Sequence, residues 1–400
     1  MLIELFLALI LGIIAGTFTG LAPGIHINLV AALLFISSAT LLALTSPIVL
    51  ACFIVSMAVA HTFIDFIPSI FLGAPEESTA LSVLPGHKML LQGRGYEAVK
   101  LTTIGCFFGI ILLLILVPIF TKTLPPIYET LGFLVPFALI IASAFLVIKE
   151  KNPVLGLIIF LSAGILGILA LNFYALKEPL FPLLTGLFGA SAIIISINEK
   201  TSLPNQKITK EKLKFKDFFS LFPSAVVSSS LCSFLPGLGS SQAAVLGSQL
   251  EKSSSKPENF LVLLGMISTL VLGLNFAALY IISKSRSGTG IIIQRLIPEI
   301  SISQLWILLA VMLVSASIAV FLSLLFARIF AKNISKFSYR KLNIAILAIL
   351  VVMSIIISGW LSLVVFIATT SLGILAISSG VRRIQLMGCL IVPVILYFLI

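Results

Sequence analysis

The chain has 400 residues, of which 60% are hydrophobic and only 10% are charged. A soluble domain needs about 25% charged residues to cover its surface, so this composition excludes an ordinary soluble protein. The net charge of +11 does not indicate a nucleic-acid partner, because the lysines and arginines cluster in loops between apolar segments. Such clusters are the orientation signal of membrane proteins.

Most apolar segments reach the roughly 20 residues that an α-helix needs to cross the hydrocarbon core. Short segments of alternating apolar and polar residues, which would indicate a membrane β-barrel, do not occur. The sequence predicts an all-α, multi-pass protein of the cell membrane. The predicted segments are residues 2–21, 25–44, 47–72, 101–120, 129–148, 153–174 and 179–197 and, after a Lys-rich loop, 218–235, 238–250, 260–282, 302–326, 342–358, 359–378 and 384–400.

The first segment is expected to remain as a helix. Glu4 precedes its long apolar run, and neither a basic leader region nor a small-residue cleavage site of the kind that ends a signal peptide is present.

A pattern near the start returns in the second half of the chain. Residues 20–32, GLAPGIHINLVAA, align with residues 233–245, SFLPGLGSSQAAV, so that the Pro-Gly pair keeps its register and an alanine pair follows each time. A Pro-Gly pair ends one helix and lets another begin. Because neither turn carries a charge, we expect two helical hairpins that turn inside the membrane.

The positive-inside rule predicts opposite orientations for the two hairpins. If the first hairpin enters from outside, residues 47–72 cross inward, and Lys88, Arg94 and Lys100 lie in the cytoplasm. Four further crossings bring the chain back to the cytoplasmic side at the Lys-rich loop. The predicted domains are two inverted repeats, residues 1–198 and 218–400, joined by a Lys-rich cytoplasmic loop at 199–217. Inverted repeats with broken helices indicate an alternating-access transporter. The alternative is a chance recurrence of Pro-Gly in an apolar chain.

The half-helix after each break should bind an anion, because its first turn offers free N–H groups and the positive end of the helix dipole. The alternative is that small residues at Gly16, Gly20, Ser240 and Ser241 only allow close helix packing. The candidate substrate-binding residues are Pro23, Gly24 and Asn28 in the first half and Pro236, Gly237, Gly239, Ser240, Ser241 and Gln242 in the second.

Asp65 is the one carboxylate deep inside an apolar segment, and His61 lies one helical turn before it. A charge at this depth costs about 2.5–3.5 kcal/mol and commonly marks an ion pathway. One interpretation is a coupling site for Na⁺ or H⁺, and the other is a pair satisfied by internal hydrogen bonds.

Two further irregular stretches are secondary candidates. The first runs through Gly73, Pro75 and Glu76 and continues to Leu84-Pro85-Gly86-His87; the second contains Ser287, Gly288 and Thr289. Alternatively, Glu76 and Glu77 begin a helix on a cytoplasmic loop. Lys284, Arg286 and Arg295 would face outside, against the rule, either as ordinary loop charges or as groups that attract an anion.

Three spaced segments together resemble the large membrane subunit of tripartite tricarboxylate transporters, the TctA family: GTFTGLAPGIHINLVAAL, FIDFIPSIFLGAPEESTALSVLPGHKMLLQGRGYEAV and SFLPGLGSSQAAVLGSQLEKSSSKPENF. The resemblance covers most of the chain in order and looks strongest for the shorter archaeal members. It implies ion-driven symport of citrate-like di- or tricarboxylates, in bacteria together with a small membrane subunit and a periplasmic binding protein.

The chain also departs from that family. Ala74-Pro75-Glu76 and Pro85-Gly86-His87 replace an Ile-Pro-Gly turn and an Asp-Gly-Tyr, and an apolar stretch with only Asn275 replaces a paired-Asn region. Citrate itself is therefore not predicted.

Two rival functions stay open. A carrier of a lipid-linked anion such as a polyprenyl phosphate would use the same helix N-termini. An intramembrane enzyme would use Asp65, His61 or the Glu76-Glu77 pair as acid or base. No catalytic residue, metal or cofactor is expected apart from the coupling ion, because HExxH and CxxC spacings are absent and the cysteines lie singly in apolar segments.

Overall fold

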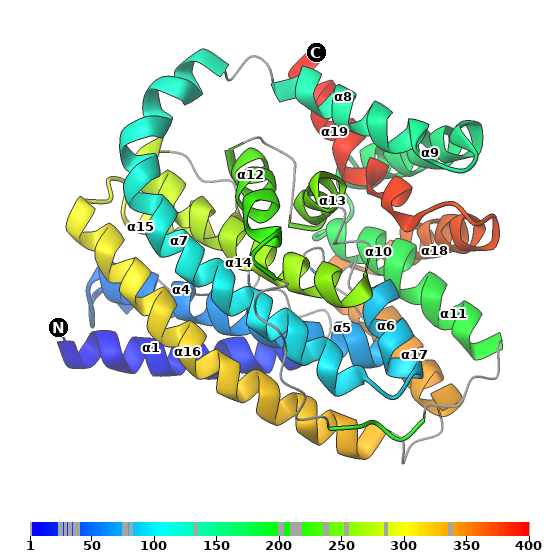
Figure 1. Ribbon diagram of the computed structural model, residues 1–400, viewed down its shortest axis with the longest axis horizontal. Coiled ribbons are helices and arrows are strands. Elements are labelled where there is room, and N and C mark those ends of the chain that lie inside the picture. The colour runs from blue at the N-terminus through cyan, green and yellow to red at the C-terminus, as the bar shows by residue number, and fades with distance from the viewer. Residues whose placement is uncertain are drawn as a thin grey trace.

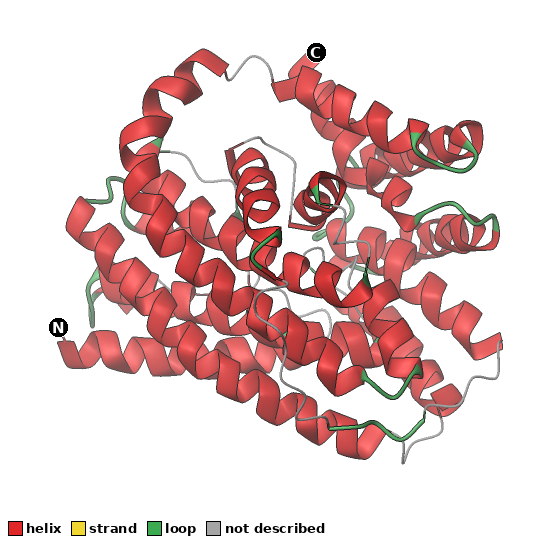
Figure 2. Ribbon diagram, in the orientation of Figure 1, coloured by secondary structure: helices red, strands yellow, loops and turns green. Residues whose placement is uncertain are grey.

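A computed structural model describes the chain except for residues 1, 23–26, 28–29, 31–33, 35–40, 74–78, 80–82, 132–134, 199–203, 209–217, 235–239, 252–255, 284–286, 335–338 and 400. All regular elements in the described ranges are helices, as Figure 2 shows. The predicted all-α class is therefore confirmed.

The helices form two bundles that lie side by side (Figure 1). The large bundle contains α1 (Leu2–Leu21), α4 (Pro47–Ile64), α5 (Phe66–Leu72), α6 (Val83–Leu91), α7 (Gly95–Leu131), α12 (Leu221–Phe234), α13 (Ser240–Leu250), α14 (Pro257–Ile281), α15 (Gly288–Leu296) and α16 (Ile302–Asn333). The small bundle contains α8 (Val135–Ile148), α9 (Pro153–Leu171), α10 (Leu180–Leu184), the π-helix η3 (Thr185–Ala190), α11 (Ser191–Asn198), α17 (Tyr339–Ser358), α18 (Ser362–Ser378), the 3₁₀-helix η7 (Arg383–Met387) and α19 (Gly388–Leu399).

Each half of the chain contributes to both bundles. Residues 2–131 and 221–333 supply the large bundle, and residues 135–198 and 339–399 supply the small one. The first helices of each half therefore pack together, and so do the last helices of each half.

Six segments in the described part are long and apolar enough to cross a membrane by length and composition: Leu2–Leu21, Pro47–Leu72, Gly95–Thr123, Pro153–Leu171, Pro257–Ile281 and Ile302–Asn333. The predicted second arm of the second hairpin is α13, whose 11 residues are too few to span. The predicted gap after residue 120 is wrong, because α7 continues to Leu131 through Pro118, Pro125 and Pro126. Proline is tolerated in membrane helices where neighbouring groups satisfy the freed carbonyls.

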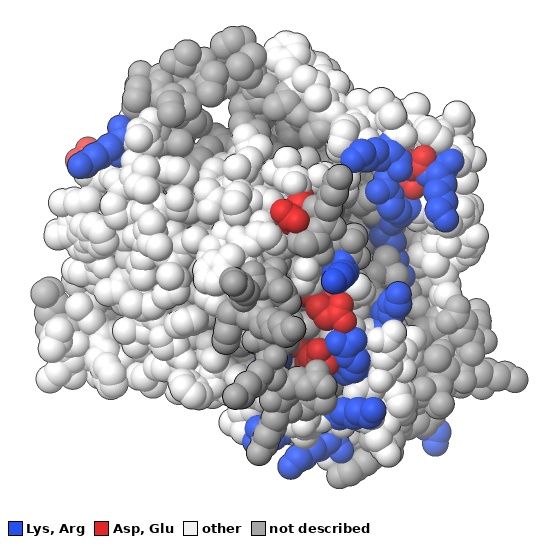
Figure 3. All heavy atoms as spheres, viewed as in Figure 1, with Lys and Arg blue, Asp and Glu red and all other residues white. Residues whose placement is uncertain are grey.

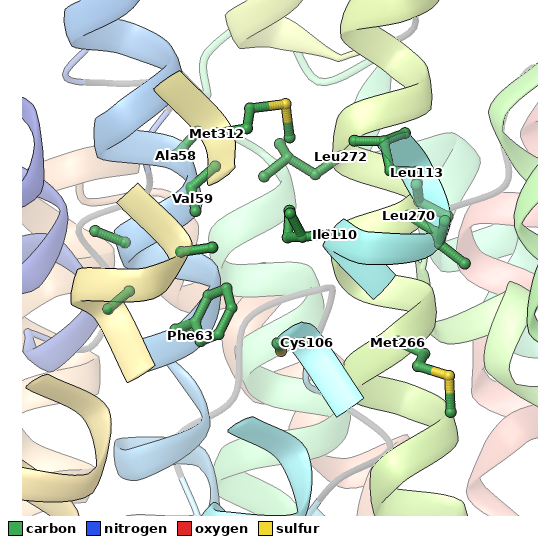
Figure 4. Packing of buried hydrophobic residues seen from close by; sticks show 14 of the residues in the cluster. Ala58, Val59, Phe63, Cys106, Ile110, Leu113, Met266, Leu270, Leu272 and Met312 are labelled. Carbon is green, nitrogen blue, oxygen red and sulfur yellow. The ribbon is translucent and has the colours of Figure 1, made fainter. Parts of the chain in front are cut away.

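Helices α4 and α14 form the centre of the large bundle. Both are apolar on all sides and buried along nearly their whole length, as expected for helices surrounded by other helices. Figure 4 shows how Val59 and Phe63 of α4 lie near Ile110 of α7 and Met312 of α16. By contrast, α1 exposes an apolar face that includes Phe18, 63% exposed, and such a face suits lipid.

Close approach between helices depends on glycine. A Cβ at Gly16 of α1 would overlap the carbonyl oxygen of Met57 in α4, and one at Gly265 of α14 would overlap the carbonyl oxygen of Thr102 in α7. Small residues at such positions let membrane helices pack without a side chain between them. The packing interpretation of Gly16 therefore agrees with the structure.

Charged side chains gather at one part of the surface. In Figure 3 the blue and red groups form a band over the junction between the two bundles, while most of the large bundle's surface is white. At the start of α7, Arg94 pairs with Glu97 at 2.7 Å and with Glu258 of α14 at 2.8 Å. Its hydrogen bonds with Glu97 and then with Glu258 raise the pKa of the Arg94 guanidinium, so the pairs persist throughout the physiological range.

Part of the Lys-rich loop docks on the turn between α6 and α7. The Lys207 N–H donates to the Gly93 carbonyl oxygen at 2.8 Å, and the Gly95 N–H donates to Gln206 Oε1 at 2.9 Å. This turn and residues 204–208 therefore lie on the same side of the molecule, as the predicted topology requires for the loop and Arg94.

Candidate functional site

The structure describes only part of the predicted substrate site. Ser240 is the first residue of α13 and is buried at 8% exposure, and Ser241 and Gln242 follow it in the same helix. The helix α13 therefore begins three residues after Gly237, and the predicted hairpin at the Pro-Gly pair stays a prediction. The candidates that lie outside the described residues are Pro23, Gly24, Asn28, Pro236, Gly237, Gly239, Pro75 and Glu76.

Asp65 lies at the junction between α4 and α5, where the long inner span is interrupted. The helical hydrogen bonds continue around it, since the Asp65 N–H donates to the His61 carbonyl oxygen at 2.8 Å. Three residues later, Pro68 has no N–H, so the carbonyl of Ile64 loses its intrahelical donor. The buried carboxylate of Asp65 and the Ile64 carbonyl, which lacks its intrahelical hydrogen bond, therefore belong to adjacent residues.

The Asp65 side chain is 2% exposed and accepts a hydrogen bond at Oδ2 from Thr79 Oγ1 at 3.0 Å. Ser69 of α5 donates to the Thr79 carbonyl oxygen at 3.2 Å. These two bonds hold Thr79 against the interrupted helix. The chain beyond α5 therefore returns to Asp65 and brings a hydroxyl to its carboxylate.

His61 has a partner on another helix. Its Nδ1 lies 2.9 Å from Thr19 Oγ1 of α1, and that hydroxyl donates to the Gly16 carbonyl oxygen at 3.2 Å. With the Thr19 hydrogen directed at Gly16, His61 Nδ1 is assigned as the donor to Thr19. His61 and Asp65 thus hydrogen-bond to different elements, and the direct interaction between them stays a prediction.

Two further hydroxyls lie beside α4. Thr103 of α7 and Ser323 of α16 are 2.9 Å apart, and Ser323 donates to the carbonyl oxygen of Phe63 at 3.3 Å. We define the Asp65 cluster as Asp65, Ser69 and Thr79, which two hydrogen bonds join. Sequence reasoning did not identify Ser69 and Thr79 as site residues, because their contacts with each other and with Asp65 depend on how the chain packs after α5, and only their polarity within or beside an apolar stretch could have marked them.

The described secondary candidates, Gly73, Ser287, Gly288 and Thr289, lie at helix ends. Gly73 ends α5 in the left-handed conformation at φ 65°, which favours glycine. Ser287 caps α15, since its Oγ accepts from the Gly290 N–H at 3.1 Å, and Gly288 and Thr289 form the first turn. The expected break at Leu84-Pro85-Gly86-His87 is wrong, because these residues begin α6 and a proline in a first turn lacks only an N–H that the helix does not use.

Asn275 of α14 is buried at 7% exposure, and its Oδ1 has no hydrogen-bond partner among the described residues. This is the asparagine that stands in the apolar stretch of the second half. It lies on α14, whose neighbours include α4, α7 and α16.

A bundle of long apolar helices with a buried carboxylate inside one span is an architecture that membrane transporters have. The chain belongs to the tripartite tricarboxylate transporter TctA family, whose family model matches residues 6–388. It is 32% identical over 407 residues to an uncharacterized protein of Methanocaldococcus jannaschii, and the alignment covers 98% of both chains. No solved structure matches the chain. The protein is therefore a multi-pass membrane transporter permease, and the suspected family is confirmed.

Proposed function

We propose that this permease is a secondary transporter that moves small di- or tricarboxylates across the cell membrane by alternating access, driven by a Na⁺ or H⁺ gradient. The observation that carries the proposal is the Asp65 cluster, because a carboxylate at 2% exposure is expensive among apolar helices. For a purely structural role of Asp65, the hydrogen bond from Thr79 would be enough. The site also contains the carbonyl of Ile64, which has no intrahelical donor because Pro68 lacks an N–H.

The proposed coupling ion binds at Asp65. Carboxylate, hydroxyl and unwound carbonyl oxygens are the groups with which broken membrane helices hold Na⁺, and the same carboxylate can carry a proton. His61, hydrogen-bonded to Thr19, lies one turn away and adds an imidazole beside the proposed ion site.

The proposed inverted repeats bring the two Pro-Gly breaks together around the substrate. Support comes from the way each half divides itself between the same two bundles and from Ser240, which begins a half-helix in a buried position. We further propose that a small membrane subunit and a substrate-binding protein are the partners, following the tripartite organisation that the family name describes.

Uptake by proteoliposomes tests this proposal. Purified protein would be supplied with labelled acetate, succinate and citrate, with Na⁺ and pH gradients imposed one at a time. We expect accumulation of at least one di- or tricarboxylate that depends on one gradient. Accumulation of none under either gradient contradicts the proposal, and protein-dependent movement of a labelled polyprenyl phosphate would favour the lipid-carrier alternative.

A further inference from the structure

The short helix η7 is held firmly against the end of α8. Arg382 Nε donates to Glu150 Oε1 at 2.7 Å, and Gln385 Nε2 donates to the same oxygen at 3.0 Å and to the Leu146 carbonyl oxygen at 3.0 Å. Glu150 is buried, with its side chain 2% exposed. Arg382 and Gln385 together therefore fix the orientation of η7.

Arg383 takes no part in this contact. Arg382 is the residue before η7 and has an extended backbone at ψ 133°, whereas Arg383 is the first residue of the 3₁₀-helix. Glu150 already accepts bonds from Arg382 and Gln385 and does not pair with Arg383. The Nη1 atom of Arg383 is buried and has no hydrogen-bond partner among the described residues.

The surroundings of Arg383 come from both bundles. Its charge acts on His87 of α6, and η7 also contacts α13, the half-helix that follows the second Pro-Gly pair (Figure 1). Burial, and then the charge of Arg383, lower the pKa of His87, so the imidazole is neutral at pH 7 and adds no second cation. In Figure 3 the band of charged groups runs over the boundary between the two bundles.

A buried guanidinium nitrogen without a hydrogen-bond partner in the described part of the chain is not explained by stability. Removing such a charge from water is expensive unless an anion and good hydrogen bonds compensate. The neighbouring Arg382 shows the usual solution, since it has a carboxylate at 2.7 Å. Arg383 has none in the described part of the chain, although guanidinium geometry matches a carboxylate with two parallel hydrogen bonds.

We infer that Arg383 binds a carboxylate group of the transported anion at the junction of α6, α13 and η7. This inference rests on the proposed function and adds a residue to it: the cation that recognises the di- or tricarboxylate. Because α13 and η7 belong to different bundles and contact each other, an anion bound there contacts both bundles.

Anion binding by the purified protein tests the inference without transport. Citrate, succinate and acetate would be titrated in lipid-free detergent, with thermal unfolding and Kd as readouts. The variants are Arg383→Gln, Arg383→Lys and the control Lys151→Gln, which removes an exposed cation on the same bundle. We expect Arg383→Gln to weaken binding of the di- or tricarboxylate by roughly 10- to 100-fold, Arg383→Lys to weaken it less, and Lys151→Gln to bind like the native protein.

The anion-free protein gives a second readout. If Arg383 is retained for binding, Arg383→Gln should unfold no earlier than the native protein, since it removes an uncompensated charge. A structural arginine would instead lower the unfolding temperature when replaced. An unchanged Kd in Arg383→Gln overturns the inference, and so does the absence of carboxylate binding by the native protein.

Two further arms separate the remaining outcomes. If vesicles containing anionic phospholipid, and not citrate, give the Arg383-dependent stabilisation, the ligand is a lipid phosphate and the inference is wrong. If the native protein transports the anion and Arg383→Gln transports it with the same KM, the transport proposal holds and Arg383 is not part of the substrate site. Arg383-dependent binding without gradient-driven uptake supports the anion site and contradicts the transport proposal.

Discussion

Asp65→Asn is the most direct test of ion coupling, and its effect on stability can be worked out first. Asparagine has nearly the same shape, and its Oδ1 can still accept from Thr79, so the loss is the difference between a charge-assisted and a neutral hydrogen bond, about 1 kcal/mol. Removing a buried charge relieves about 2.5–3.5 kcal/mol. We therefore expect the variant to insert, fold and unfold thermally no earlier than the native protein.

The expected effect on accumulation is much larger. One coupled charge moving through 100 mV supplies about 2.3 kcal/mol. Because 1.4 kcal/mol changes an equilibrium ratio tenfold, this free energy corresponds to a roughly 50-fold change in the ratio of internal to external substrate concentration. Asp65→Asn should lose this factor when uptake is measured at an imposed 100 mV, while exchange of labelled for unlabelled substrate persists.

The control for this experiment is Glu299→Gln, which removes an exposed carboxylate and should leave the accumulation ratio unchanged. If Asp65→Asn reaches the native ratio, the carboxylate is structural. In that case the ion would be held by carbonyls and hydroxyls at the helix breaks.

Three further predictions follow from packing and topology. Gly16→Leu should destabilise the protein by about 1–3 kcal/mol or prevent assembly, because a Cβ already overlaps Met57, and a normal yield and unfolding midpoint would contradict this. Arg94→Gln should lower stability by about 1–2 kcal/mol in thermal unfolding through the loss of its Glu97 and Glu258 pairs, whereas the exposed control Lys88→Gln should not. Cysteines at Lys207 and Lys341 should both react only from the cytoplasmic side, and labelling from opposite sides would refute the inverted repeats.

The sequence was sufficient to locate most helices and the central carboxylate. Hydrophobic runs bounded by proline or charge correspond closely to α1, α9 and α14, because burial in lipid or protein requires uninterrupted apolar helix. Asp65 stood out because it is expensive where it lies. The break predicted at Pro85-Gly86 failed because the effect of proline depends on its place in the helix, which composition alone does not reveal.

The partners of these residues could not be predicted. Thr79 reaches Asp65 because the chain returns after Gly73, and Ser323 reaches Thr103 across 220 positions, so both contacts depend on tertiary packing. Arg382 and Arg383 look alike in sequence, as two charges before an apolar segment. Only the tertiary structure distinguishes Arg382, which precedes η7 and pairs with Glu150, from Arg383, which begins η7 and does not.

The proposed ion and anion sites are joined by two short helices. α5 begins immediately after Asp65, and the carbonyl of Ile70 in α5 accepts a hydrogen bond from His87 of α6, which Arg383 faces from the other bundle. A Cβ at Gly86 would lie 2.6 Å from the Ile70 side chain, so α5 and α6 pack closely at this point. We propose that a change at Asp65 that moves α5 also moves α6. Binding of an ion at Asp65 can thus reach the carboxylate at Arg383 without direct contact between the two ligands, which is the physical requirement for coupling their movements.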